Sequence, residues 1–129
     1  MLENLKRNIQ NSIHWLTQHA EQDSHFSSKK NDQLLQNFVN DLIYFSEIKM
    51  SSDIHIEPQE DFIRIRLRID GVLSDQFHLP KFILEQLCSK LKILANIDIA
   101  QRRLPQDGKF IFHPKNGLKT HIRMSTCPT

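Results

Sequence analysis

The stretch that decides the fold is residues 51–73, SSDIHIEPQEDFIRIRLRIDGVL. Over residues 62–70, apolar and charged side chains alternate strictly. A repeat of two is typical of a half-buried strand, because successive side chains of a strand point to opposite faces. We therefore predict one face of isoleucine and leucine and one charged face. The arginines on the charged face are Arg64, Arg66 and Arg68.

Successive arginines on such a face stand roughly 6–7 Å apart, so they repel one another unless an anion or an acidic neighbour lies opposite them. Asp70 and Gly71 follow directly. Both residues tolerate positive φ, which a two-residue hairpin turn requires. The sequence thus predicts a hairpin that carries a row of arginines on one face and returns through Val72.

The flanking segments predict an α+β domain in which helices cover an antiparallel sheet. Asp32 is predicted to cap the first helix, Pro80 to begin the second and Asn96 to end it. Residues 101–108 are predicted to form a polar turn, bent at Asp107 and Gly108. The predicted elements are a helix over 33–49, strands over 51–57, 61–70 and 72–78, a helix over 80–95, and strands over 109–113 and 119–124.

Residues 1–20 place apolar side chains at spacings of three and four, which predicts an amphipathic helix. The polar stretch that follows predicts a linker, so residues 1–31 are expected to form an arm and residues 32–129 the domain. Two interpretations stay open for the arm. It packs on the domain, or it docks on another protein.

Composition indicates an ordinary globular protein: 129 residues, 39% of them apolar and 25% charged, with a net charge of +2. This charge is too small to indicate a polyanion-binding protein by itself. Cys88 and Cys127 lie far apart and form no Cys-x-x-Cys motif, so the sequence suggests neither a disulfide framework nor a cysteine zinc site, and we expect a reducing cytoplasm. No run of about 18 apolar residues and no signal-peptide pattern is present, so we expect a soluble cytoplasmic chain.

Four motifs occur in a specific order: SDIHIEP at 52–58, RLRIDGVL at 66–73, RLPQDG at 103–108 and RMSTCPT at 123–129. Together they resemble the secretion (traffic) ATPases, which power type II secretion, type IV pilus assembly and related DNA-uptake machines. The resemblance runs from about Leu34 to the end of the chain. It departs from the family at Cys127, where a leucine is usual.

The resemblance implies a PAS-like domain that precedes a RecA-like ATPase domain in a hexameric motor. For the parent protein it implies ATP and Mg²⁺ as cofactors. The implied partners are its own motor domain, neighbouring subunits, an inner-membrane platform protein and other assembly components, with no nucleic acid. The parent would be cytoplasmic and held peripherally at the inner membrane through these partners.

The chain itself has no phosphate-binding P-loop, which needs two glycines five residues apart followed by Lys-Ser or Lys-Thr. Its only glycines are Gly71, Gly108 and Gly117. We therefore interpret it as an amino-terminal fragment that has no catalytic residues of its own and does not turn over ATP.

The resemblance also implies that arginines of this domain reach nucleotide bound by a motor domain, a role that falls on Arg66 and Arg68. Arg64 lies one step outside the motif, and Arg103 and Arg123 are further candidates. The alternative for these arginines is a solvated basic face or salt bridges to an adjacent acidic strand.

The remaining motif residues are interpreted as structural. Asp53, His55, Glu57 and Asp70 could suggest general acid/base chemistry or a metal site, but no third or fourth metal ligand is placed by the sequence. We expect Asp53 and His55 to hold loops and Asp70 and Gly71 to form the hairpin turn. Asp107 and Gly108 are expected to hold the turn before the last strand pair.

A second function remains open, that of a stand-alone module that binds nucleic acid or an acidic protein through its arginines. No aromatic side chains are interleaved with those arginines, as stacking on bases would require. A PAS-like sensor of a small ligand is a third possibility, for which no convergent polar set is visible.

Overall fold

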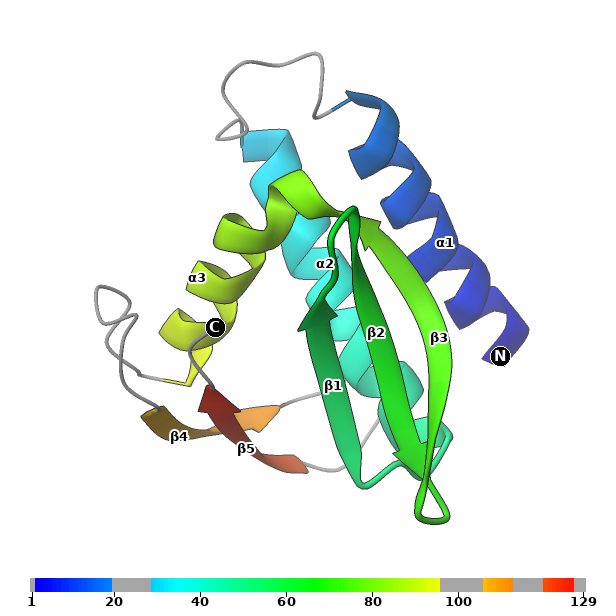
Figure 1. The fold of residues 1–129 in the computed structure, drawn as a ribbon, viewed down its shortest axis with the longest axis vertical. Helices are drawn as coiled ribbons and strands as arrows, with labels where there is room; N and C mark the ends of the chain where they lie inside the picture. The colour runs from blue at the N-terminus through cyan, green and yellow to red at the C-terminus, as the bar shows by residue number, and fades with distance from the viewer. Residues whose placement is uncertain (1, 20–28, 96–105, 113–119, 127–129) are drawn as a thin grey trace. The chain divides into compact units, whose positions relative to one another are not determined.

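The computed structural model describes residues 2–19, 29–95, 106–112 and 120–126 (Figure 1). Contacts within the chain divide it into two compact units, Met1–Leu84 and Glu85–Thr129. The α+β class is confirmed, with helices and an antiparallel three-stranded sheet. The elements are α1 (Leu2–His19), α2 (Lys29–Ile48), β1 (Asp53–Pro58), β2 (Phe62–Ile69), β3 (Val72–Pro80), the 3₁₀ turn η1 (Lys81–Ile83), α3 (Leu84–Leu94), β4 (Gln106–Phe112) and β5 (Thr120–Thr126).

Strand β2 is the centre of the first unit, flanked by β1 and β3 in antiparallel pairing. Ile63, Ile65 and Leu67 are fully buried, whereas the arginines between them are only partly buried. The predicted alternation is therefore confirmed. It divides the sheet into an apolar face and a charged face.

The hairpin between β2 and β3 turns at Asp70 and Gly71, which have φ of 51° and 81°. Ile69 and Val72 are paired across the turn, so the loop has two residues. Positive φ at both central positions is the conformation that matches the twist of a hairpin. The predicted turn is confirmed.

Strand β3 carries a β-bulge that the sequence did not predict. Ile65 pairs with Phe77, but Arg66 pairs with Asp75, so Gln76 is an extra residue on β3. Because the extra residue shifts the alternation by one step, Phe77 falls on the apolar face opposite Ile65 and His78 on the charged face opposite Arg64. Asp75, on the turn side of the bulge, lies opposite Arg66.

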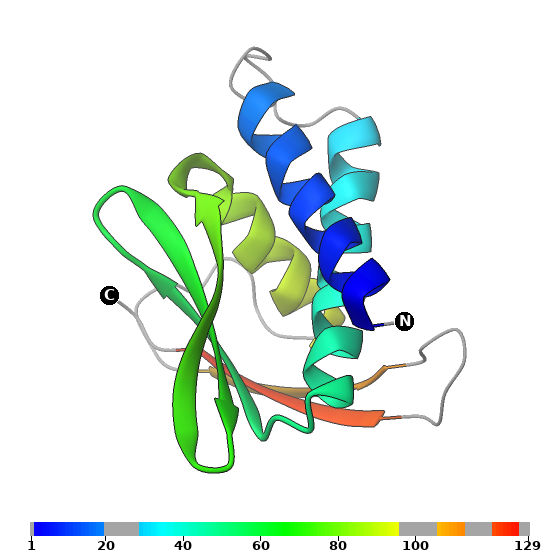
Figure 2. The same ribbon diagram turned by 90° about the vertical axis from the view of Figure 1, so that its right-hand side faces the viewer.

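Helices α1 and α2 lie side by side on the apolar side of the sheet (Figure 2). The ring of Phe45 on α2 meets that of Phe77 on β3 edge to face, with centroids 5.3 Å apart. Helix α1 contacts both α2 and β3, and its residues Ile9 and Leu16 are fully buried. Of the two interpretations of the first helix, the structure shows the one in which it packs on its own chain.

Two helix boundaries differ from the prediction. Helix α2 begins at Lys29, so Asp32 lies in its first turn, where a negative charge favours the helix dipole, and is not the N-cap. Pro80 is the last residue of β3, with φ of −64° and ψ of 138°, and α3 begins after η1. The ring of proline fits an extended strand end as well as a helix start, so a proline by itself does not show which of the two is present. Asn96 lies outside the described residues.

No helix in the described ranges is long and apolar enough to cross a membrane.

Strands β4 and β5 form a two-stranded antiparallel sheet in the second unit. The predicted bend at Asp107 and Gly108 was wrong, because both residues lie within β4 and pair with Ser125 and Met124. The hydrogen-bond ladder with β5 outweighs the local turn tendency of an Asp-Gly pair. The rest of the predicted turn, residues 101–105, lies outside the described residues.

Candidate functional site

The charged face of the first sheet is the candidate site, and we call it the arginine face. Each arginine of β2 stands opposite a polar residue of β1, since Asp53 pairs with Arg68, His55 with Arg66 and Glu57 with Arg64. On the other side of β2, Asp75 pairs with Arg66 and His78 with Arg64. The arginine face consists of Asp53, His55, Glu57, Arg64, Arg66, Arg68, Asp75 and His78.

The carboxylate of Glu57 accepts hydrogen bonds from two arginines of this face. Arg66 donates to it through two nitrogens, with Nε 2.6 Å from Oε1 and Nη2 2.7 Å from Oε2. Arg64 Nε donates to the same Oε1 at 3.4 Å. The side chains of Arg66 and Glu57 are 25% and 27% exposed, so the pair is half-buried. Such bidentate, partly desolvated pairs are stronger than ordinary surface ion pairs.

This pairing widens the pH range over which both groups are charged. The hydrogen bonds from Arg66 lower the pKa of Glu57, with burial acting in the opposite direction and the charges of Arg66 and Arg64 adding to the decrease. The hydrogen bond to Glu57 likewise raises the pKa of Arg66. The Glu57 carboxylate therefore stays ionised to lower pH than an isolated one.

Arg68 is held less firmly. Its Nε lies 3.3 Å from Oδ2 of Asp53, and its Nη1 donates to the backbone oxygen of Gly71 at 3.1 Å. The side chains of Arg68 and Asp53 are 37% and 50% exposed. Asp53 also accepts from the hydroxyl of Ser52 at 2.8 Å. Arg68 is therefore tied to the hairpin turn but remains open to solvent.

The edge of the arginine face on β3 is occupied by a histidine–carboxylate pair. Nε2 of His78 lies 2.9 Å from Oδ2 of Asp75, and the imidazole stacks on the ring of Phe62 with centroids 4.5 Å apart. Three carboxylates, those of Asp53, Glu57 and Asp75, thus stand beside three arginines. With neutral histidines the charges balance, so this face is not a simple basic patch.

Comparison with known families places this geometry in context. The family model described as "Type II/IV secretion system protein" matches residues 28–129. The chain belongs to this family. The resemblance drawn from the four motifs is therefore confirmed, and the arginine face lies wholly inside the matched region.

Relatives in this family are pilus assembly ATPases and secretion proteins. The chain is 37% identical to the type IV pilus assembly ATPase TfpB of Acinetobacter baylyi over 77% of its length, and 34% identical to the type IV pilus assembly ATPase PilB of Myxococcus xanthus over 99%. It is 41% identical to type II secretion system protein E of Xanthomonas campestris over 70%. It spans 17%, 23% and 16% of these three relatives, respectively.

The structure brings together only part of the predicted residue set. Arg66 and Arg68 share one face with Asp53, His55 and Glu57, all from the first two motifs of the family. Asp75 and His78 were not among the residues selected from the sequence. The two-residue turn sets Asp75 opposite Arg66, whereas His78 comes opposite Arg64 because of the bulge at Gln76. Without the bulge, the register set by the turn would pair Arg64 with Phe77. Arg103 lies outside the described residues, and Asp70 and Gly71 form the turn.

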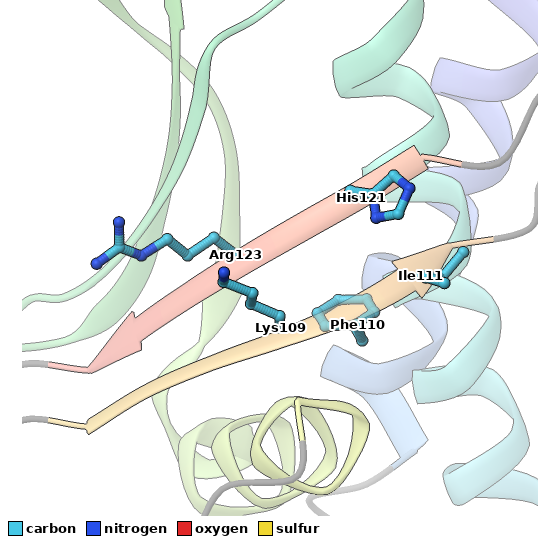
Figure 3. A pocket seen from close by; sticks show the side chains of 5 residues that line it. All are labelled: Lys109, Phe110, Ile111, His121 and Arg123. Atoms are coloured by element: carbon cyan, nitrogen blue, oxygen red, sulfur yellow. The ribbon is translucent and has the colours of Figure 1, made fainter.

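Arg123 lies in the second unit, on β5. Its side chain is 71% exposed, and its Nη2 is 3.6 Å from Oδ1 of Asp107. Lys109 is its direct partner across the strand pair. Both cations line a shallow hollow of about 320 Å³ (Figure 3), together with Phe110, Ile111 and His121.

Asp53, His55 and Glu57, which were interpreted from the sequence as structural, lie together on β1. Within the described ranges, no group of three or more histidine, cysteine, aspartate or glutamate side chains is placed to hold an ion. Asp53 and Glu57 instead accept from arginines. The structure therefore shows the salt bridges to an adjacent acidic strand that the sequence left open as the alternative for these arginines.

Proposed function

We propose that this domain supplies arginines in trans to nucleotide bound by the motor domain of a hexameric ATPase, and that it mediates contacts between subunits. The ATPase would power type II secretion or the assembly of type IV pili or pseudopili. The observation that carries this proposal is the row of partly exposed arginines on the central strand of a packed sheet, within a chain of this family.

Phosphoryl transfer gains most from charges that are already in position. Its transition state spreads negative charge over the phosphoryl oxygens, and an arginine from a neighbouring domain stabilises that charge by several kcal/mol. Arg66 and Arg68 stand on β2, whose alternate residues are fully buried, so their backbone is fixed by the core. The bidentate pair with Glu57 engages two of the five N–H donors of a guanidinium.

The remaining features of the parent protein are part of the same proposal. We infer a RecA-like motor domain after this PAS-like domain, with ATP and Mg²⁺ bound there. Its partners would be the neighbouring subunits of the hexamer, an inner-membrane platform protein and other assembly components. It would work in the cytoplasm, associated peripherally with the inner membrane. Family membership and the names of the relatives support this inference.

The test is the steady-state ATPase activity of the full-length parent carrying Arg66→Ala or Arg68→Ala. We expect kcat to fall at least tenfold, with a smaller change in KM, because the arginine acts chiefly on the transition state. Arg7→Ala is the matched control, since Arg7 is an exposed arginine on α1, away from the arginine face. Circular dichroism and gel filtration would show that each variant folds and assembles. Normal turnover in both folded variants would remove the trans-arginine role.

A binding module for nucleic acid or an acidic protein is the second candidate. The balanced charges of the arginine face do not favour it, whereas Lys109, His121 and Arg123 around the β4–β5 hollow do. Its test is the affinity of the chain for a single-stranded oligonucleotide at 50 and 200 mM salt. A steep fall with salt whose log–log slope is reduced by about 0.7–1 in Lys109→Ala would support the module, because each phosphate contact adds that much to the slope.

A further inference from the structure

The position of Glu57 on the arginine face raises a question that the trans-arginine role does not answer. A guanidinium that is to bind phosphate already binds a carboxylate, through both Nε and Nη2. The same carboxylate also accepts from Arg64. One acidic side chain therefore engages two neighbouring arginines at once.

A phosphate approaching these arginines meets two costs. It must share or replace the hydrogen bonds to Glu57, and its own negative charge is repelled by the nearby carboxylate. When only a fraction of a site is free to bind, the apparent affinity falls by that fraction. The pair is partly buried and bidentate, so it lowers the fraction of Arg66 that is free of Glu57.

We propose that Glu57 is an internal competitor for Arg64 and Arg66, so that only a multiply charged polyphosphate draws the two guanidiniums away from it. Glu57 then sets the affinity threshold at which the arginine face engages a nucleotide. This inference rests on the proposed function. It adds Arg64 to the phosphate-binding set and assigns Glu57 a role as a specificity-determining residue.

Asp53 provides the internal comparison. It carries the same charge on the same strand and faces Arg68, but at 3.3 Å, through one Arg68 nitrogen, and with a more exposed pair of side chains. If only the net charge of the face mattered, neutralising Asp53 or Glu57 would have the same effect. If the carboxylate competes through its contacts, the effect of Glu57 is larger.

The experiment measures the affinity of the 129-residue chain for inorganic tripolyphosphate by isothermal titration calorimetry at fixed ionic strength. We expect Glu57→Gln to tighten binding about tenfold or more, and Asp53→Asn to tighten it less than threefold. The double variant Glu57→Gln/Arg66→Ala should lose the gain. Equal effects of the two single variants, or no gain in Glu57→Gln, would overturn the proposal.

A second measurement uses the unmodified chain and so does not depend on how a variant folds. The Nε–H resonance of Arg66, observed by nuclear magnetic resonance, reports its hydrogen bond to Glu57. We expect it to move as tripolyphosphate saturates the chain, together with the resonance of Arg64. An Arg66 resonance that stays in place at saturation would contradict competition.

These outcomes are separable from those of the proposed function. Turnover of Arg66→Ala in the parent decides whether the arginines act on nucleotide. Tripolyphosphate binding in the isolated chain decides whether Glu57 competes for them. Tight binding by Glu57→Gln alongside normal turnover of both Arg66→Ala and Arg68→Ala would retain the competitor and remove the trans-arginine role. Reduced turnover of these variants without any gain in Glu57→Gln would do the opposite.

Discussion

Glu57 and its two arginine partners connect the sequence pattern of β1 and β2 to a specific charge arrangement. The alternation in both segments places polar side chains on one face, and antiparallel pairing sets Glu57 opposite Arg64. The bidentate bond nevertheless runs diagonally, to Arg66. Diagonal neighbours on one face of a sheet are within reach of long side chains. Arg66 can therefore form the bidentate pair with Glu57, although the residue directly opposite Arg66 is His55.

The stability of the chain should depend on pH through Glu57. Its folded pKa is lowered, so its contribution to stability is present above the unfolded pKa of about 4.3 and is lost as pH falls through the folded value. We expect Glu57→Gln to lower the free energy of unfolding by about 0.5–1 kcal/mol at pH 7. That difference should shrink toward the acid end of a urea-unfolding series from pH 7 to pH 3.

The control for this series is Glu60→Gln, because Glu60 is exposed in the short loop between β1 and β2. Its stability difference should stay small at all pH values. A difference for Glu57→Gln that remained constant with pH would mean that packing, and not charge, is lost. The other charged and titratable groups on this face are Asp53, His55, Arg64, Arg66, Arg68, Asp75 and His78.

Most of the helices and strands that were predicted correctly follow from a local pattern of apolar and polar residues. Strand β2 alternates over eight residues and was predicted within one residue at each end. The Asp-Gly pair at 70–71 forms a turn, whereas the Asp-Gly pair at 107–108 lies within a strand. The two pairs differ in their long-range pairing partners, which no local pattern contains. The bulge at Gln76 has the same origin.

The turn between β2 and β3 gives a prediction about backbone strain. Gly71 has φ of 81°, and a Cβ added there would meet no atom within 4 Å. Gly71→Ala should therefore lower the free energy of unfolding by urea by about 1–2 kcal/mol, because alanine is strained in the left-handed conformation of this residue but meets no steric clash. Gly71→Asn should cost less, since asparagine visits that conformation more readily. Equal stability of Gly71→Ala and the wild type would show that the turn rearranges without strain.

On the scale of the first unit, the arginine face and the helices occupy opposite sides of one sheet. The apolar face of β2 buries Ile63, Ile65 and Leu67 on the side where α1 and α2 lie (Figure 2). A strand fixed by its buried residues holds its other side chains in a defined row. The core of this unit thus positions the candidate site, although it contributes no residue to it.

The amphipathic pattern of residues 1–20 predicted a helix but left its partner undecided, because an apolar stripe fits the chain's own core and a foreign surface equally well. In the structure, Ile9 and Leu16 of α1 are fully buried and Leu5 nearly so. The helix contacts α2 and β3. The match to the Myxococcus xanthus relative extends over 99% of the chain, so it includes this helix.

The contribution of α1 to the core is open to direct measurement. Ile9→Ala should lower the free energy of unfolding of the 129-residue chain by about 2–5 kcal/mol, because it leaves a cavity at a fully buried position. Gln10→Ala is the matched control on the exposed side of the same helix and should change stability by less than about 0.5 kcal/mol. Both values come from urea unfolding followed by circular dichroism. If Ile9→Ala were as stable as Gln10→Ala, α1 would not be part of the core in solution, and its apolar stripe would be available to a partner. A large loss for Ile9→Ala alone would instead make α1 a structural support of the sheet that carries the arginine face.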